Sequence, residues 1–79
     1  MEPRPTPSDT ARMILDLFKQ HGIRPGEVLM VRTLISFSVS SGLTNRELTD
    51  GLQHGSEQGW WEDSGKGSFR LEGKGFWTV

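Results

Sequence analysis

Apolar residues recur at helical spacing early in the chain. Over residues 9–20 they fall on one side of a helix: Ala11, Ile14, Leu15 and Phe18. Ser8 or Asp9 is the expected N-cap of this helix. His21 and Gly22 supply an expected end, because glycine readily takes the left-handed conformation that stops a helix. The pattern therefore predicts a first amphipathic helix ending near Gln20.

A second helix is expected to open at Pro25 and to run to about Val39, because the first helical turn tolerates proline. Its apolar residues occupy two faces: Val28, Val31, Ile35 and Val39 on one, and Met30, Leu34 and Phe37 on the other. A helix that is apolar over more than half its circumference is usually buried. We therefore expect a central core helix. The alternative is that Met30 and Phe37 form a dimer surface.

A third helix begins at a capping box, in which Thr44 and Glu47 each bond the other's backbone N–H. The residues expected to face inward are Leu48, Leu52 and Gly55. The helix should end near Gly59. Gly51 and Gly55 each cost a helix about 1 kcal/mol relative to alanine. They indicate either close approach by a neighbouring helix or local softness.

Two short apolar runs, residues 60–62 and 68–71, flank a turn at residues 63–67 and predict a β-hairpin. Alternate side chains of a strand point to opposite faces, so one of the two adjacent tryptophans should be core. We expect Trp61 to point inward with Phe69 and Leu71, and Trp60 to be partly exposed. Residues 72–75 form a second expected turn, after which residues 76–77 fold back onto the core.

These elements predict an α+β fold with a three-helix core followed by a two-stranded β wing, to which a very short strand at Leu43 would add a third strand. We expect residues 9–79 to form one domain. Residues 1–8 are expected to be a flexible tail, because Pro3, Pro5 and Pro7 disfavour helix.

The most distinctive segments of the chain are Gly42-Leu43-Thr44, Glu47-Leu48, Leu52, Gly59-Trp60-Trp61-Glu62, Phe69-Arg70-Leu71 and Gly73-Lys74-Gly75. With these segments as its sharpest part, the chain over roughly residues 9–75 resembles the winged-helix domains of bacterial and phage transcription regulators. In such domains the helix before the wing enters DNA. The resemblance implies a small, single-domain DNA-binding protein that acts as a transcriptional regulator or as an accessory protein.

The outer face of the third helix then supplies candidate DNA contacts. Arg46 can donate two hydrogen bonds to guanine, and Gln53 can pair with adenine. Asn45 and Thr49 can reach phosphates or base edges. On the wing, Lys66 and Arg70 are candidate contacts to the DNA backbone; Arg4 in the tail would add one more. The expected partner is double-stranded DNA.

Charge favours a competing hypothesis. The chain has nine basic and ten acidic residues, a formal net charge of −1, whereas a typical nucleic-acid module is basic. Residues 44–59 carry one arginine, Arg46, against Glu47, Asp50 and Glu57. The alternative function is a winged-helix protein–protein interaction module that docks a partner protein or a second copy of itself without nucleic acid.

The sequence gives little support for a metal site, an enzymatic activity or a membrane span. The sequence has no cysteine, and its two histidines, His21 and His54, are not spaced as metal ligands, so we expect no metal site. It holds no catalytic motif, so we expect neither an enzyme nor a cofactor. No apolar run approaches the roughly 20 residues of a membrane span. With no secretory signal in the sequence, we expect a cytoplasmic protein.

Overall fold

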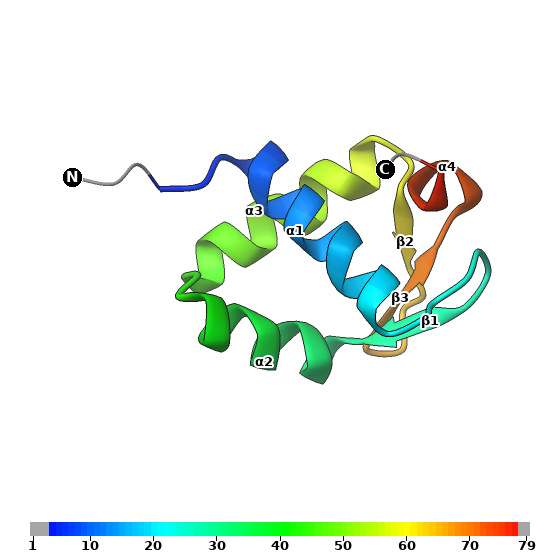
Figure 1. The fold of residues 1–79 in the computed structure, drawn as a ribbon, viewed down its shortest axis with the longest axis horizontal. Helices are drawn as coiled ribbons and strands as arrows, with labels where there is room; N and C mark the ends of the chain where they lie inside the picture. Colours follow the sequence, from blue (N-terminus) through cyan, green and yellow to red (C-terminus); the bar gives the residue numbers. More distant parts are fainter. Residues whose placement is uncertain (1–3, 78–79) are drawn as a thin grey trace.

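Two long helices pack against each other and cover one face of a small sheet (Figure 1). The computed structural model describes residues 4–77. In this range the elements are α1 (Pro7–Gln20), β1 (Val28–Met30), α2 (Val31–Ser41), α3 (Asn45–Glu57), β2 (Trp61–Asp63), β3 (Ser68–Leu71) and α4 (Gly73–Phe76). The fold is α+β, as the sequence predicts, with a helical core and a β-hairpin after the third helix.

Helix α1 begins earlier than expected. Its N-cap is Thr6, which accepts a hydrogen bond from the Asp9 N–H at 3.1 Å, while the Asp9 carboxylate accepts from the Thr6 N–H at 3.1 Å. This capping box places Pro7 in the first turn, where its missing N–H costs nothing. Residues 7 and 8 therefore belong to the helix rather than to a tail. Residues 1–3 of the expected tail lie outside the described range.

The prediction of one helix over residues 25–39 is wrong. Pro25 and Gly26 form a turn, with Gly26 at a φ of +88°, and a strand follows at Val28–Met30. Helix α2 starts only at Val31 and ends at Ser41, followed by the C-cap Gly42 in the left-handed conformation. The strand forms because β3 offers it an antiparallel partner, with Leu29 opposite Phe69. That partner is remote in sequence and overrides the local helical periodicity.

Helix α2 is also not the central, fully buried helix that its composition predicts. Leu34 is buried, but Ile35 is 50% exposed and Val39 is 75% exposed. Phe37 packs partly against the core, whereas Met30 on β1 is exposed. The central position belongs instead to α1, which packs closely against α3 and whose side chains Leu15 and Phe18 lie in the core.

The sheet has the order β1-β3-β2, and both pairings are antiparallel. The hairpin of β2 and β3 is confirmed, with Trp61 opposite Leu71. The third strand is β1 and not Leu43, which lies in the connection between α2 and α3. There the Leu43 N–H caps α2 by donating to the Ser38 carbonyl at 2.9 Å.

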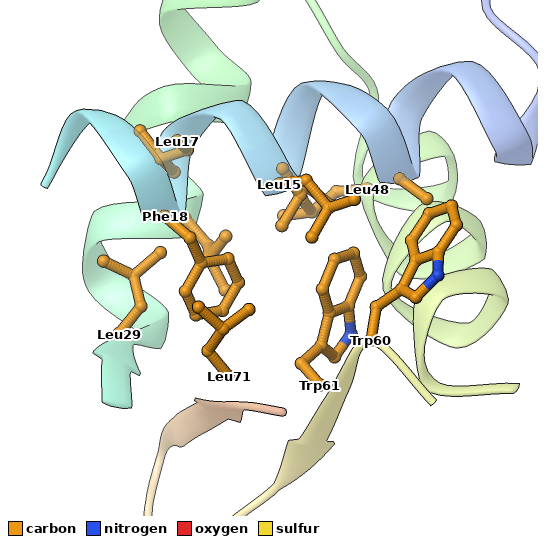
Figure 2. Packing of buried hydrophobic residues seen from close by; sticks show 11 residues of the cluster. Leu15, Leu17, Phe18, Leu29, Leu48, Trp60, Trp61 and Leu71 are labelled. Carbon is orange, nitrogen blue, oxygen red and sulfur yellow. The ribbon is translucent and has the colours of Figure 1, made fainter. Parts of the chain in front are cut away.

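Both adjacent tryptophans are core residues, and Figure 2 shows them side by side beneath α1. Trp61 stacks on Phe18 with ring centroids 5.7 Å apart and donates its indole N–H to the Leu52 carbonyl at 3.0 Å. Trp60 is only 7% exposed, so the expectation of partial exposure is wrong. Trp60 lies just before the strand, so strand alternation does not apply to it.

Glycines on α3 allow these close contacts. A Cβ on Gly51 would lie 2.4 Å from Thr10 Cγ2, and a Cβ on Gly55 would lie 2.1 Å from Trp61 Cζ2. The glycines therefore serve close approach and not local softness. At the C-terminal end, residues 73–76 form the one-turn helix α4 in place of the expected turn, and Gly75 lies directly against the Trp60 backbone.

Candidate nucleic-acid interface

The helix with the candidate DNA contacts, α3, is fixed at its start by the predicted capping box. The Glu47 N–H donates to Thr44 Oγ1 at 3.1 Å, and the Thr44 N–H donates to Glu47 Oε1 at 2.9 Å. Three residues, Gly42 to Thr44, join α2 to α3. A turn of this length containing glycine is typical of a helix-turn-helix.

Arg4 also holds the start of α3. Its Nε donates to Glu47 Oε2 at 2.9 Å, its Nη2 contacts Glu47 Oε1, and Nη2 also donates to the Gly42 carbonyl at 2.9 Å. The hydrogen bond from Arg4, followed by the backbone bond from Thr44, lowers the pKa of Glu47 to about 2. The same pair raises the pKa of Arg4 above its ordinary value. The sequence suggested Arg4 as a DNA contact, but in the structure its side chain binds Glu47 and the Gly42 carbonyl of the protein itself.

The two faces of α3 have opposite environments. Its inner face, with Leu48, Gly51 and Gly55, is buried against α1 and Trp61. Leu52 is half-buried. The outer face carries the candidate contacts, and all four are exposed: Asn45, Arg46, Thr49 and Gln53. The helical arrangement therefore brings these side chains together on one open surface.

Charges on this outer face are partly paired. Arg46, 91% exposed, faces Asp50 on the next turn with Nε and Oδ2 3.9 Å apart. Such exposed pairs are weak and exchange readily with other partners. The Thr49 hydroxyl donates to the Asn45 carbonyl at 2.9 Å, a bond within the helix. Among residues 4–77, Arg46 has only the weak pair with Asp50 and the Gln53 amide donates no hydrogen bond, so both offer side-chain donors to another molecule.

The two wing candidates are placed differently. Lys66 is exposed in the turn between β2 and β3. Arg70 on β3 forms ion pairs with Glu62, its neighbour across the hairpin, and with Glu72, whose Oε2 lies 3.5 Å from Arg70 Nε. The structure thus neutralises Arg70 between two carboxylates and leaves Lys66 without an ion pair among residues 4–77.

The structure adds Arg32 to the candidate DNA contacts, a cation that the sequence did not single out. The hairpin turn is tied to the start of α2, because the Val31 N–H donates to the Gly67 carbonyl at 2.9 Å. Arg32 and Lys66 each lie one residue from this bond, and both are exposed. The sequence signal for the position of Arg32 was the Pro25-Gly26 dipeptide. This dipeptide marks a turn, which argues against a helix that runs through from residue 25 to Arg32.

Residues 4–77 contain neither a metal-binding cluster nor a membrane-spanning helix. No group of three or more His, Asp or Glu side chains within residues 4–77 is arranged to hold a metal ion. His54 packs edge-on against Trp60, with ring centroids 5.9 Å apart. Of the helices in this range, none is both long enough and apolar enough to cross a bilayer.

Comparison with known proteins identifies no relative. A scan against protein-family models gave no match, and comparisons with curated proteins and with solved structures gave no significant similarity.

Proposed function

We propose that the protein is a small winged-helix DNA-binding protein, a transcriptional regulator or accessory protein, that places α3 in the major groove of duplex DNA. The observation that carries the proposal is that α3 buries its inner face in the core and exposes a polar outer face. A three-residue turn joins α2 to this helix. The β-hairpin that follows α3 supports the winged-helix resemblance.

Arg46 and Gln53 are the proposed readers of base edges, with Asn45 and Thr49 beside them. Arg32 and Lys66 are the proposed contacts to phosphates. Arg70 is not among them, because leaving Glu62 and Glu72 would expose two carboxylates to the DNA backbone. Asp50 and Glu57 repel phosphates as well, so we expect weak binding by one copy.

The test is an NMR titration of the protein with duplex DNA at low salt. We expect amide shifts at Arg46, Thr49, Gln53 and Lys66. Lys66→Gln should weaken binding and lower the salt dependence by about one counterion. Arg12→Gln, which removes an exposed cation from α1, is the matched control and should change neither. Unmoved α3 amides at millimolar DNA would overturn the proposal.

A second candidate function is protein–protein interaction, and one observation favours it. Four large apolar side chains are exposed within residues 28–39: Val28, Met30, Ile35 and Val39. Val28 and Met30 share one face of β1, and Ile35 and Val39 lie one turn apart on α2. Neighbouring exposed apolar side chains are typical of sites that contact another protein. Sedimentation over a range of concentrations tests self-association, which Val39→Glu should abolish while Ser36→Glu, at an exposed polar position of the same helix, should not.

A further inference from the structure

A groove separates the end of α1 from α4, away from the surface proposed for DNA. It has a volume of about 510 Å³ and is lined by Lys19, Gly22, Ile23, Arg24, Phe76 and Trp77. This volume is in the range of sites that bind small molecules or peptide side chains. None of the lining residues belongs to α3 or to the β2–β3 hairpin. The groove is therefore a separate feature of the molecule.

One wall of the groove is apolar and aromatic. Ile23 and Phe76 are partly buried against the core, and the rings of Phe76 and Trp77 meet edge to face with centroids 5.0 Å apart. Trp77 is 79% exposed, the most exposed large apolar side chain in the described range. An exposed tryptophan beside a hollow is the type of residue that anchors protein partners, because it offers much contact area at a small cost in side-chain entropy.

This wall is held in place by the backbone. The Phe76 N–H donates to the Glu72 carbonyl and the Trp77 N–H to the Gly73 carbonyl, both at 3.1 Å. Gly75 lies against the buried Trp60, so α4 is seated on the core. Opposite it, the Ile23 N–H donates to the Phe18 carbonyl at 3.0 Å. The groove is thus formed before a ligand arrives, which lowers the entropic cost of binding.

The polar part of the groove is basic. Lys19 and Arg24 line it, and none of the acidic side chains within residues 4–77 does. In the described chain neither cation forms an ion pair. The Glu27 carboxylate, three residues after Arg24, accepts the backbone N–H of Arg24 at 2.7 Å. On a protein of net charge −1, two unpaired cations beside an apolar wall select a ligand that is both acidic and apolar.

We propose that this groove binds an acidic segment of a partner protein, with an aromatic or large apolar side chain against Phe76 and Trp77 and carboxylates at Lys19 and Arg24. A ligand recognised by its phosphates alone would leave the apolar wall uncovered, which is why a peptide fits better than a nucleic-acid backbone. The proposal does not depend on DNA binding by α3.

Tryptophan fluorescence gives a direct test, because Trp60 and Trp61 are buried and Trp77 is exposed. The probe is an acetylated, amidated peptide with one phenylalanine flanked by two glutamates on each side. We expect a blue shift of emission that saturates with peptide. Lys19→Gln/Arg24→Gln should weaken binding about tenfold, the loss expected for removing two charge-assisted contacts. Arg12→Gln/Lys66→Gln, which removes the same charge elsewhere, should leave binding unchanged.

Amide shifts at Gly22 and Ile23 provide a second readout, which also serves Trp77→Ala, where the fluorescent reporter is lost. We expect that variant to lose binding. The proposal is wrong if millimolar peptide moves neither readout, or if the peptide with glutamines in place of glutamates binds equally well. It is also wrong if the two double variants weaken binding alike, or if duplex DNA shifts Gly22 and Ile23 and the peptide does not.

Discussion

Arg4 binds both carboxylate oxygens of Glu47, the residue that caps α3, although 43 positions separate the two in sequence. The Glu47 side chain is only 16% exposed. One carboxylate thus joins the segment before α1 to the start of the helix proposed to read DNA. The ion pair makes the position of that start depend on the charge of Glu47.

The first prediction concerns pH. The pKa of Glu47 is lowered from 4.5 to about 2 in the folded protein, so the folded state favours the ionised form. The resulting stabilisation is complete above pH 4.5 and is lost as the pH falls through about 2. In Arg4→Gln the pKa of Glu47 should rise, while the bonds from Thr44 keep it below its ordinary value. Titration of the Glu47 carboxyl ¹³C signal measures the change. An unchanged midpoint in Arg4→Gln would show that the ion pair does not form in solution.

The second prediction concerns the contact between Gly55 and Trp61. Alanine normally stabilises a helix interior by about 1 kcal/mol relative to glycine. At Gly55 the new methyl would instead meet the indole ring at 2.1 Å. We therefore expect Gly55→Ala to destabilise the protein by about 1–3 kcal/mol in urea unfolding. Gly73→Ala is the control, because its Cβ meets nothing within 4 Å, and it should change stability by less than about 0.5 kcal/mol. A stabilised Gly55→Ala would contradict the packing.

The third prediction concerns Thr10, which is fully buried against Gly51 and whose hydroxyl has no hydrogen-bond partner among residues 4–77. A buried hydroxyl without a partner costs stability. Thr10→Val replaces it with a methyl group of similar size. We expect the unfolding free energy to rise by about 1 kcal/mol. Thr49→Val, at an exposed position of α3, should bring no such gain. A loss of stability in Thr10→Val would mean that the hydroxyl is bonded in solution.

Local signals predicted the parts of the fold that depend on neighbouring residues. The capping box of Thr44 and Glu47 marked the start of α3, and the spacing of Leu48 and Gly55 identified its buried side. The glycine-rich turn predicted the hairpin. Each of these features is set within a few residues by hydrogen bonds or helical geometry, so one sequence suffices to find it.

Contacts between distant residues were not predictable in this way. The apolar run from Val28 to Val39 fits helical spacing without a break, and only the pairing of β1 with β3 divides it into strand and helix. In the candidate site, the outer face of α3 follows from periodicity. The pairing of Arg4 with Glu47 follows only from the folded chain, as does the position of Arg32 beside the hairpin turn.

The fourth prediction tests strand β1, which the helical periodicity of the sequence did not predict. Leu29 is buried in the core, whereas its neighbour Val28 is 43% exposed. This alternation belongs to a strand with one face covered. We expect Leu29→Ala to destabilise the protein by about 2–5 kcal/mol, because it leaves a cavity beneath α1. Val28→Ala removes apolar atoms from the same strand on its open face and should cost less than about 1 kcal/mol. Chemical denaturation of both variants measures the difference. Equal losses would mean that residues 28–30 do not form the strand that divides this segment from α2.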